Sequence, residues 1–340
     1  MSKAKVPGKT DDHGSRSTWP SKSAGERGVA LIIVILMVSV IVAVTLQLNR
    51  ASRSEIYEAA NLKDGIRLFY IAKSGFHLGQ GFLAVHQGNF DALNEDWASP
   101  GKIAGKADML FGAGALQVLI EDESGKIPIH RLWDGKVLNT TVCDLMARLL
   151  KQPEFGLKDK DVDDILDSLK DWMDADDIVT GGGAETPYYA ALAKPYAAKN
   201  GPLDCIEELM MIKGITREIY EGTKDRPGLR QLLTIYGDGR ININTAPALV
   251  LRSLSPAMTV ERAQKMDEYR RTPGLDLSSP DWYRKVVSGV DLNSQLTKTQ
   301  SNVFRIVSEG RTGSMVRSIE SVVMRSSDGR TMTILTWKAS

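Results

Sequence analysis

The stretch Val29–Leu48, VALIIVILMVSVIVAVTLQL, contains twenty residues and no charge. A helix of that length rises about 1.5 Å per residue and spans roughly 30 Å, the thickness of the hydrocarbon core of a bilayer. No later stretch of the chain is comparably long and apolar. The sequence therefore predicts a protein that crosses a membrane once, through a helix near its N-terminus.

The charges around this stretch predict its orientation. Residues 1–28 contain six Lys or Arg and three acidic residues, a net charge of +3. Arg50 and Arg53 follow the stretch, but the longer positive segment in front of it favours a cytoplasmic N-terminus. Residues 49–340 are then expected outside the cytoplasm.

The boundary at Gly28 predicts how the N-terminus is processed. A common secretory signal has a shorter apolar region followed by a small-residue cleavage site, whereas here the small residues Gly25 and Gly28 precede the apolar stretch. The string Arg27-Gly28-Val29-Ala30 resembles a class III, type IV prepilin signal, which is cut after the glycine. Cleavage between Gly28 and Val29 would leave 312 residues with a net charge of −2. An uncleaved signal anchor is the alternative.

Composition excludes several classes of protein. The 340 residues are 42% hydrophobic and 25% charged, with a net charge of +1. These values exclude collagen, bulk disorder and a polytopic transporter, and they lack the basic excess of a dedicated nucleic-acid binder. The four histidines form no His-Glu-x-x-His pair, and neither Gly-x-Ser-x-Gly nor a phosphate-binding loop occurs, so no enzyme is predicted.

Apolar spacing predicts the order of the remaining elements. Steps of three and four residues predict one helix over residues 29–86 that starts in lipid and ends against a soluble head. Residues 116–129 are predicted to form a strand, a Glu-Ser-Gly turn and a second extended piece. Extended segments are also predicted at 303–310, 316–325 and 331–337, and the last two are joined by a Ser-Ser-Asp-Gly-Arg turn. Helical patterns lie between them, mainly at 141–150, 161–173, 203–212 and 260–271. Another helix is predicted after residues 244–247, where Thr245 can cap it and Pro247 sits in its first turn. This order predicts a head in which an all-α domain is inserted between strands.

Six internal strings are similar to those of a known family. They are LNEDWA (93–98), IEDESGKI (120–127), DWMDADD (171–177), GAETPYY (183–189), LDCIEEL (203–209) and ININTA (241–246). With the glycine-cut leader and the closing hairpin, they resemble the K-class minor pseudopilins of bacterial type II secretion over residues 25–340.

The resemblance implies an α+β pilin-like fold. A long N-terminal transmembrane helix packs on an antiparallel sheet, and a large all-α domain is inserted between the strands. The implied segments are a cytoplasmic prepilin leader (1–28), a transmembrane segment (29–48), the helix and first strands of a periplasmic head (49–130), the inserted α-helical domain (131–290) and the C-terminal strands of the head (291–340).

The resemblance also implies a role without catalysis. The protein would nucleate or cap assembly at the tip of the pseudopilus, for export of folded proteins across the outer membrane. The implied partners are the I- and J-class minor pseudopilins, the H-class and major pseudopilins, the lipid of the bacterial inner membrane, and the prepilin peptidase. The resemblance also implies methylation of the N-terminus. Ile33 stands at the fifth mature position, where most pilin-like helices carry glutamate. Together with a head too bulky to be stacked along a thin fibre, this favours a capping position.

An acidic segment suggests a metal site. Residues 158–177 contain nine aspartates and three lysines. Asp174, Asp176 and Asp177 crowd the end of the predicted helix, where they repel one another and oppose the negative end of the helix dipole. A hard cation would relieve both effects.

The loop that follows supplies a fourth carboxylate, Glu185. It stands at position twelve when Asp174 is counted as position one, and the glycines 181–183 allow it to fold back onto the aspartates. Ile178 and Val179 at positions five and six exclude an EF-hand, but the all-oxygen ligand set suits Ca²⁺. We therefore predict a Ca²⁺ site. The resemblance implies the same, because members of that family bind calcium. The alternative is a capping loop without metal.

Two further features leave alternatives open. Cys143 and Cys205 would face an oxidising periplasm, where they form either a disulfide closing a span of 61 residues or two buried free thiols. The ININTA string also occurs in helix-hairpin-helix proteins that hold DNA, which makes a pilus-like DNA-uptake component the alternative function. The Gly-apolar-Gly turn that contacts phosphate is missing, because Gly214-Ile215 is followed by Thr216, so no nucleic-acid partner is expected.

Overall fold

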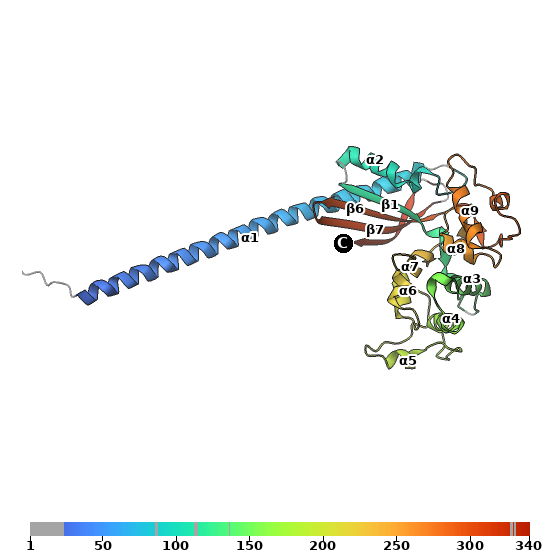
Figure 1. Cartoon of the computed structure of the whole chain (residues 1–340), viewed down its shortest axis with the longest axis horizontal. Coiled ribbons are helices and arrows are strands. Elements are labelled where there is room, and N and C mark those ends of the chain that lie inside the picture. Colours follow the sequence, from blue (N-terminus) through green and yellow to red (C-terminus); the bar gives the residue numbers. More distant parts are fainter. Residues whose placement is uncertain (1–23, 86–87, 112–114, 136, 327–328, 330) are drawn as a thin grey trace, which may run out of the picture. The chain divides into compact units, whose positions relative to one another are not determined.

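The computed structural model describes residues 24–85, 88–111, 115–135, 137–326, 329 and 331–340 (Figure 1). The chain divides into two units, residues 1–63 and residues 64–340. Most of the expected leader, residues 1–23, lies outside the described residues.

The first unit contains most of helix α1 (Ala24–Val85), which continues into the second unit. The side chains of residues 29–48 are all exposed in the structure. From Gly28 to Val85 the helix is long and apolar enough to cross a membrane, with a mean hydropathy of 3.3 in its most apolar window, and no other helix of the described ranges meets this criterion. The predicted long helix is confirmed, and it begins five residues earlier than expected.

An antiparallel sheet organises the second unit. Its strands are β1 (Leu116–Asp122), β6 (Val303–Thr312), β7 (Met315–Arg325) and β8 (Met332–Ala339), and they lie in the order β1-β6-β7-β8. All three pairings are antiparallel. β1 and β6 are neighbours although 180 residues separate them in the chain. The predicted strands are confirmed, and the first is followed, as predicted, by a turn at residues 123–125 and a short second strand, β2 (Ile127–Pro128).

The last turns of α1 pack on one face of this sheet. Leu68, Ala72 and Phe76 of α1 share a core with apolar residues of β6 and β7. Helix α2 (Pro100–Phe111), preceded by the 3₁₀-helix η1 (Asp96–Ala98), contributes Ile103 and Ala107 to the same core. This core holds the end of the long helix to the strands.

Glycine allows α1 to approach the sheet closely at one position. A Cβ added to Gly75 would overlap Ser308 Oγ and the side chain of Leu116, whereas a Cβ on Gly81 would meet nothing within 4 Å. Gly75 is therefore required by the packing of the helix on the sheet, and Gly81 is not.

Alanine at these two positions is expected to have opposite effects. Gly75→Ala overpacks the helix–sheet contact and should lower the free energy of unfolding by about 1–3 kcal/mol. Gly81→Ala adds helix propensity without a clash and should raise it by about 0.5–1 kcal/mol. Denaturant unfolding of the detergent-solubilised chain measures both, and equal effects of the two variants would contradict the close approach at Gly75.

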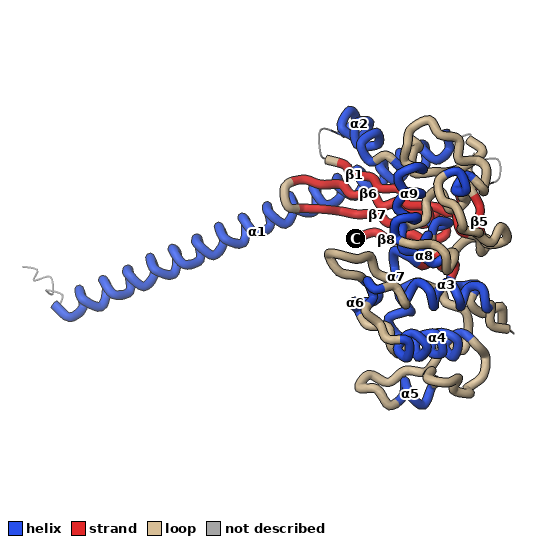
Figure 2. Tube along the Cα trace, turned by 45° about the vertical axis from the view of Figure 1, so that its right-hand side comes forward, coloured by secondary structure: helices blue, strands red, loops and turns tan. Residues whose placement is uncertain are grey.

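Between β1 and β6 most of the regular elements are helices, joined by loops (Figure 2). The helices are α3 (Thr140–Leu150), α4 (Asp159–Met173), α5 (Thr186–Ala190), α6 (Arg217–Glu221), α7 (Leu229–Leu232), α8 (Ala248–Ser253) and α9 (Val260–Arg270). The 3₁₀-helices are η2 (Glu123–Gly125), η3 (Ile129–Arg131), η4 (Pro153–Phe155), η5 (Ile206–Met211) and η6 (Trp282–Lys285). Short strands β3 (Leu233–Thr234), β4 (Ile241–Asn242) and β5 (Thr297–Lys298) form parallel pairs β2–β3 and β4–β5. We call residues 129–296 the helical block, and its apolar core is distinct from the core of the sheet.

Two local predictions in the helical block were wrong. The segment expected to be an α-helix at residues 203–212 forms only the 3₁₀-helix η5. This helix ends at Met211, shortly before Gly214, whose φ is +84°. Thr245, expected to cap α8, lies instead in the interior and donates a hydrogen bond of 2.6 Å to Asp122 Oδ2. The Thr245 hydroxyl is thus engaged by a buried carboxylate from a distant strand, and no side chain of the described residues caps α8.

The ININTA string joins the helical block to the sheet. The Asn242 side-chain amide donates to the Asp91 carbonyl at 3.0 Å and to Ser301 Oγ at 2.8 Å. Burial raises the pKa of the neighbouring Asp122 carboxyl above its ordinary value. These buried polar contacts account for a string that sequence reasoning associated with DNA-binding proteins.

Candidate functional site

The acidic segment lies on α4 and the loop after it. An apolar stripe that includes Val162, Ile165 and Leu169 buries one side of α4 in the core of the helical block. The helix ends at Asp174, whose backbone is extended. Since that stripe fixes the helix, the carboxylates of its other side face the following loop.

The loop after α4 is held by these carboxylates. Asp171 accepts two hydrogen bonds of 3.1 Å from the Thr180 amide, and Asp167 accepts one of 2.8 Å from the Gly182 amide. Lys213 Nζ donates to the carbonyls of residues 182 and 183 from the other side. A Cβ on any of the glycines 181–183 would overlap an aspartate side chain of α4. The glycines are therefore required for the turn, as expected from the sequence.

This turn brings three of the four predicted metal ligands together. Asp174, Asp176 and Glu185 each place a carboxylate oxygen so that the three oxygens lie within 4.8 Å of one another. Asp174 and Glu185 are buried and Asp176 is exposed. The cluster therefore opens to solvent on one side, so that an ion could enter.

The buried oxygens of this cluster have no hydrogen-bond partners in the part of the chain that the structure describes. Asp174 Oδ1 and both Glu185 carboxylate oxygens are buried and unpaired. Burial, together with the neighbouring aspartates, raises the pKa of Glu185 to about 7, and it also raises the pKa of Asp174. Buried charges are normally paired or coordinate a metal, and carboxylate oxygens are hard ligands of the kind that Ca²⁺ prefers. The residues present therefore fit a calcium ion.

The fourth predicted ligand, Asp177, is not part of this cluster. Its Oδ1 accepts a hydrogen bond of 3.1 Å from Asn200 Nδ2, which also donates to the Asp176 carbonyl at 3.0 Å. Asn200 has a φ of +49°, the only described residue other than glycine with a positive φ. Sequence reasoning missed Asn200, because the 22 residues between it and Asp177 gave no signal that the two meet.

The candidate disulfide is not formed. Both cysteines are free, Cys143 half-buried on α3 and Cys205 exposed at the start of η5. The Cys205 thiol lies 3.9 Å from Glu208 Oε1, a residue of its own turn. The alternative of two buried thiols is also wrong for Cys205.

The predicted processing site lies within α1. Gly28 and Val29 are both helical and exposed, so the peptide bond between them is accessible along the side of the helix. The charged leader in front of position 24 lies outside the described residues.

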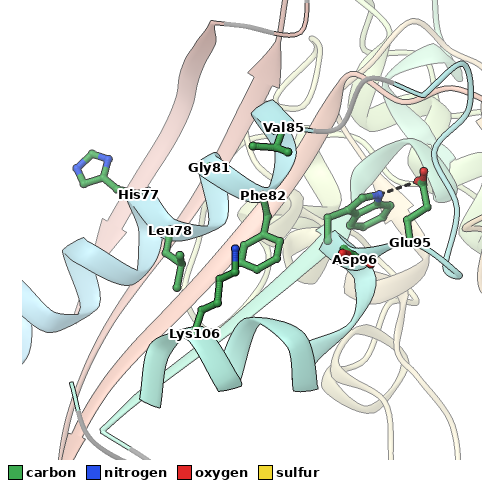
Figure 3. Close-up of a pocket in the computed structure, with 9 residues that line it drawn as sticks. His77, Leu78, Gly81, Phe82, Val85, Glu95, Asp96 and Lys106 are labelled. Carbon is green, nitrogen blue, oxygen red and sulfur yellow. Dashed lines mark hydrogen bonds between the residues drawn. The ribbon is translucent and has the colours of Figure 1, made fainter. Parts of the chain in front are cut away.

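The second unit also contains a cavity of about 630 Å³ beside α1, η1 and α2 (Figure 3). Lys106 Nζ lies 5.2 Å from the centre of the Phe82 ring, and Trp97 Nε1 donates to Glu95 Oε2 at 3.0 Å. Its only histidine, His77, is hydrogen-bonded to Gln80 on the same helix. The cavity brings together no nucleophile with a base among the described residues.

Comparisons with known proteins agree on one family. Two family models described as "Type II secretion system (T2SS), protein K" match residues 132–225 and 241–298. Type II secretion system protein K of Pseudomonas aeruginosa is 28% identical over 316 residues, covering 90% of this chain and 91% of that protein. Type II secretion system protein K of Klebsiella pneumoniae is 23% identical, and the match covers 73% of this chain and 76% of that protein.

A solved structure has the same fold. It is a chain in the crystal structure of the GspK-GspI-GspJ complex from the type 2 secretion system of enterotoxigenic Escherichia coli, with a TM-score of 0.65 and 18% identity. The match covers 83% of this chain and 99% of that one. An N-terminal apolar helix, a helical domain and an antiparallel sheet are thus shared.

Proposed function

This chain belongs to the type II secretion system protein K family, and we propose on that premise that it caps the tip of the pseudopilus and helps to start its assembly. It is a minor pseudopilin of type II secretion. The observation that carries the proposal is the match to protein K over 90% of the chain. The role needs surfaces and no catalytic step.

The membrane helix supplies one of these surfaces. Residues 29–48 of α1 expose apolar side chains on every side, which suits a helix surrounded by lipid and by other apolar helices. We propose that this segment crosses the inner membrane, with the head in the periplasm. Prepilin peptidase would cut between Gly28 and Val29 and methylate the new terminus, and the H-class and major pseudopilins would pack beside the helix.

The head supplies the second surface. The similar enterotoxigenic Escherichia coli chain was solved together with GspI and GspJ, and we propose that this chain likewise assembles with I- and J-class minor pseudopilins. The helical block stands between β1 and β6 in the chain and has a core of its own. We propose that it is an inserted domain, which widens the head and prevents further subunits from stacking above it.

Calcium is part of the proposal. The buried, unpaired oxygens of Asp174 and Glu185, together with Asp176, would hold one Ca²⁺ ion. The ion would neutralise the carboxylates and fix the glycine loop against α4. Its role is to stabilise the fold of the helical block.

The DNA-uptake alternative is not supported. The family models that match the helical block are those of secretion protein K. The ININTA string is buried at positions 241–246, where it contacts the sheet rather than solvent.

Loss of the protein should stop export at the outer membrane. Deleting the gene in its own bacterium is expected to leave folded type II substrates in the periplasm, and a plasmid copy of the wild-type gene should restore them to the medium. Immunoblots of medium and periplasm measure this partition, with a resident periplasmic protein as the control. Unchanged export in the deletion strain would contradict the proposed function.

A further inference from the structure

One edge of the sheet is the strand β8, and no further strand pairs with it among the residues that the structure describes. β8 pairs only with β7, whereas β1 at the opposite edge has α2 packed against it (Figure 1). An uncovered edge strand presents unpaired backbone N–H and C=O groups that another extended chain can pair with. Native proteins usually cover or shorten such an edge, so its exposure over a strand of eight residues is informative.

The register shows which backbone groups point outward. Ser318 of β7 and Ser340 exchange two hydrogen bonds, of 2.9 and 3.0 Å. Hydrogen-bonded and non-hydrogen-bonded pairs alternate along an antiparallel ladder, so Ala339 and Trp337 direct their N–H and C=O groups away from β7. The ladder has a bulge at Leu335, between the pairs Val322–Thr336 and Val323–Ile334. The straight edge available for pairing is therefore residues 336–340.

Apolar side chains border this edge. Trp337 is 41% exposed and Ile334 is 47% exposed. Trp337 packs edge-on against Phe76 of α1, with 4.9 Å between ring centres, so its exposed part is fixed in position on the α1 side of the sheet. A strand added here would cover apolar surface on this side as well as pair with the backbone.

Charges on the opposite side of the sheet end in an unpaired lysine. Arg305 of β6 forms ion pairs with Glu123 and with Glu320 of β7. Lys338 stands directly across from Glu320 on β8, and no ion pair joins it to any residue that the structure describes. Arg305, Glu320 and Lys338 thus alternate in charge across β6, β7 and β8. An acidic residue on a strand added beyond β8 would continue this alternation.

We propose that β8 is a docking edge on which a partner pseudopilin adds an extended strand with an acidic residue opposite Lys338. The backbone groups of Trp337 and Ala339 require an extended partner, the Trp337 side chain requires an apolar residue on the α1 side, and Lys338 requires a carboxylate on the other. The inference rests on the proposed function, because it names the surface through which the head meets its partners.

Amide hydrogen exchange tests the pairing directly. The full-length chain is compared alone and mixed with the full-length I- and J-class pseudopilins of the same bacterium, in detergent with calcium. Strand addition should slow exchange in residues 332–340 about tenfold or more, because outward amides become hydrogen-bonded. If a complex forms but these amides exchange as fast as in the free chain, the inference about β8 is overturned while the proposed function stands. Absence of any complex overturns the proposed function, and the inference with it.

Charge reversal supplies a matched pair of variants. Lys338→Glu should weaken the complex about tenfold, since it places like charges together at the interface. Lys265→Glu makes the same change on the exposed face of α9 and should leave the affinity unchanged. If the two variants bound the partners with equal affinity, the proposal that the added strand carries an acidic residue opposite Lys338 would be overturned.

Discussion

Replacing Glu123 with alanine is expected to lower the free energy of unfolding by about 3–5 kcal/mol, the cost of removing one partner from a buried ion pair. The Glu123 carboxylate is buried and receives Lys126 Nζ and Arg305 Nε, each at 2.7 Å. Burial alone would raise the pKa of Glu123, but the two cations outweigh it and hold the pKa below its ordinary value. Alanine would leave both cations without this carboxylate in a site shielded from water.

The effect should be specific to this buried pair. Glu309→Ala removes a carboxylate from the half-exposed pair with Arg311 on the same sheet, and it should cost about 1 kcal/mol or less. Urea unfolding of the full-length chain in detergent measures both variants. If Glu123→Ala cost no more than Glu309→Ala, the buried ion pairs around Glu123 would not stabilise the fold.

Calcium is expected to stabilise the full-length chain by about 3 kcal/mol when free calcium is a hundredfold above its dissociation constant. The physical reason is that the ion relieves the repulsion and desolvation of the carboxylates of Asp174 and Glu185. Thermal unfolding in calcium and in chelator measures the shift. The double variant Asp174→Ala/Asp176→Ala should lose it, while Asp163→Ala on the exposed side of α4 should keep it.

A single substitution separates a calcium site from a loop that is merely acidic. Glu185→Gln removes a buried charge without changing shape, so in chelator it should raise the melting temperature, and in calcium it should lower it relative to the wild type. If calcium shifted the melting temperature of the Asp174→Ala/Asp176→Ala variant as much as that of the wild type, the proposed calcium site would be contradicted.

Local patterns predicted the elements that depend on local physics. The apolar run at 29–48 and the three- and four-residue spacing behind it predicted α1, because a helix and its exposed apolar faces follow from composition and period. The alternating strands and the Ser-Ser-Asp-Gly-Arg turn predicted the hairpin of β7 and β8 in the same way. Asp174, Asp176 and Glu185 could be predicted because three glycines stand between them in the chain.

Contacts between distant segments could not be predicted. Thr245 was expected to cap a helix, yet it hydrogen-bonds to Asp122 across 123 residues. Asp177 was expected to bind metal, yet Asn200 engages its carboxylate. A disulfide and two buried free thiols were both open for the two cysteines, because both lay in the same predicted domain, whereas the fold leaves Cys205 exposed beside Glu208. Each outcome depends on which surfaces meet, and that is decided by tertiary packing.

The most direct test of the central claim is size-exclusion chromatography of the full-length chain with full-length I- and J-class pseudopilins, in detergent and calcium. If the chain is a tip-forming minor pseudopilin, the three proteins should elute together as one stable complex. If the chain elutes alone while the other two associate, it does not cap the assembly that they form.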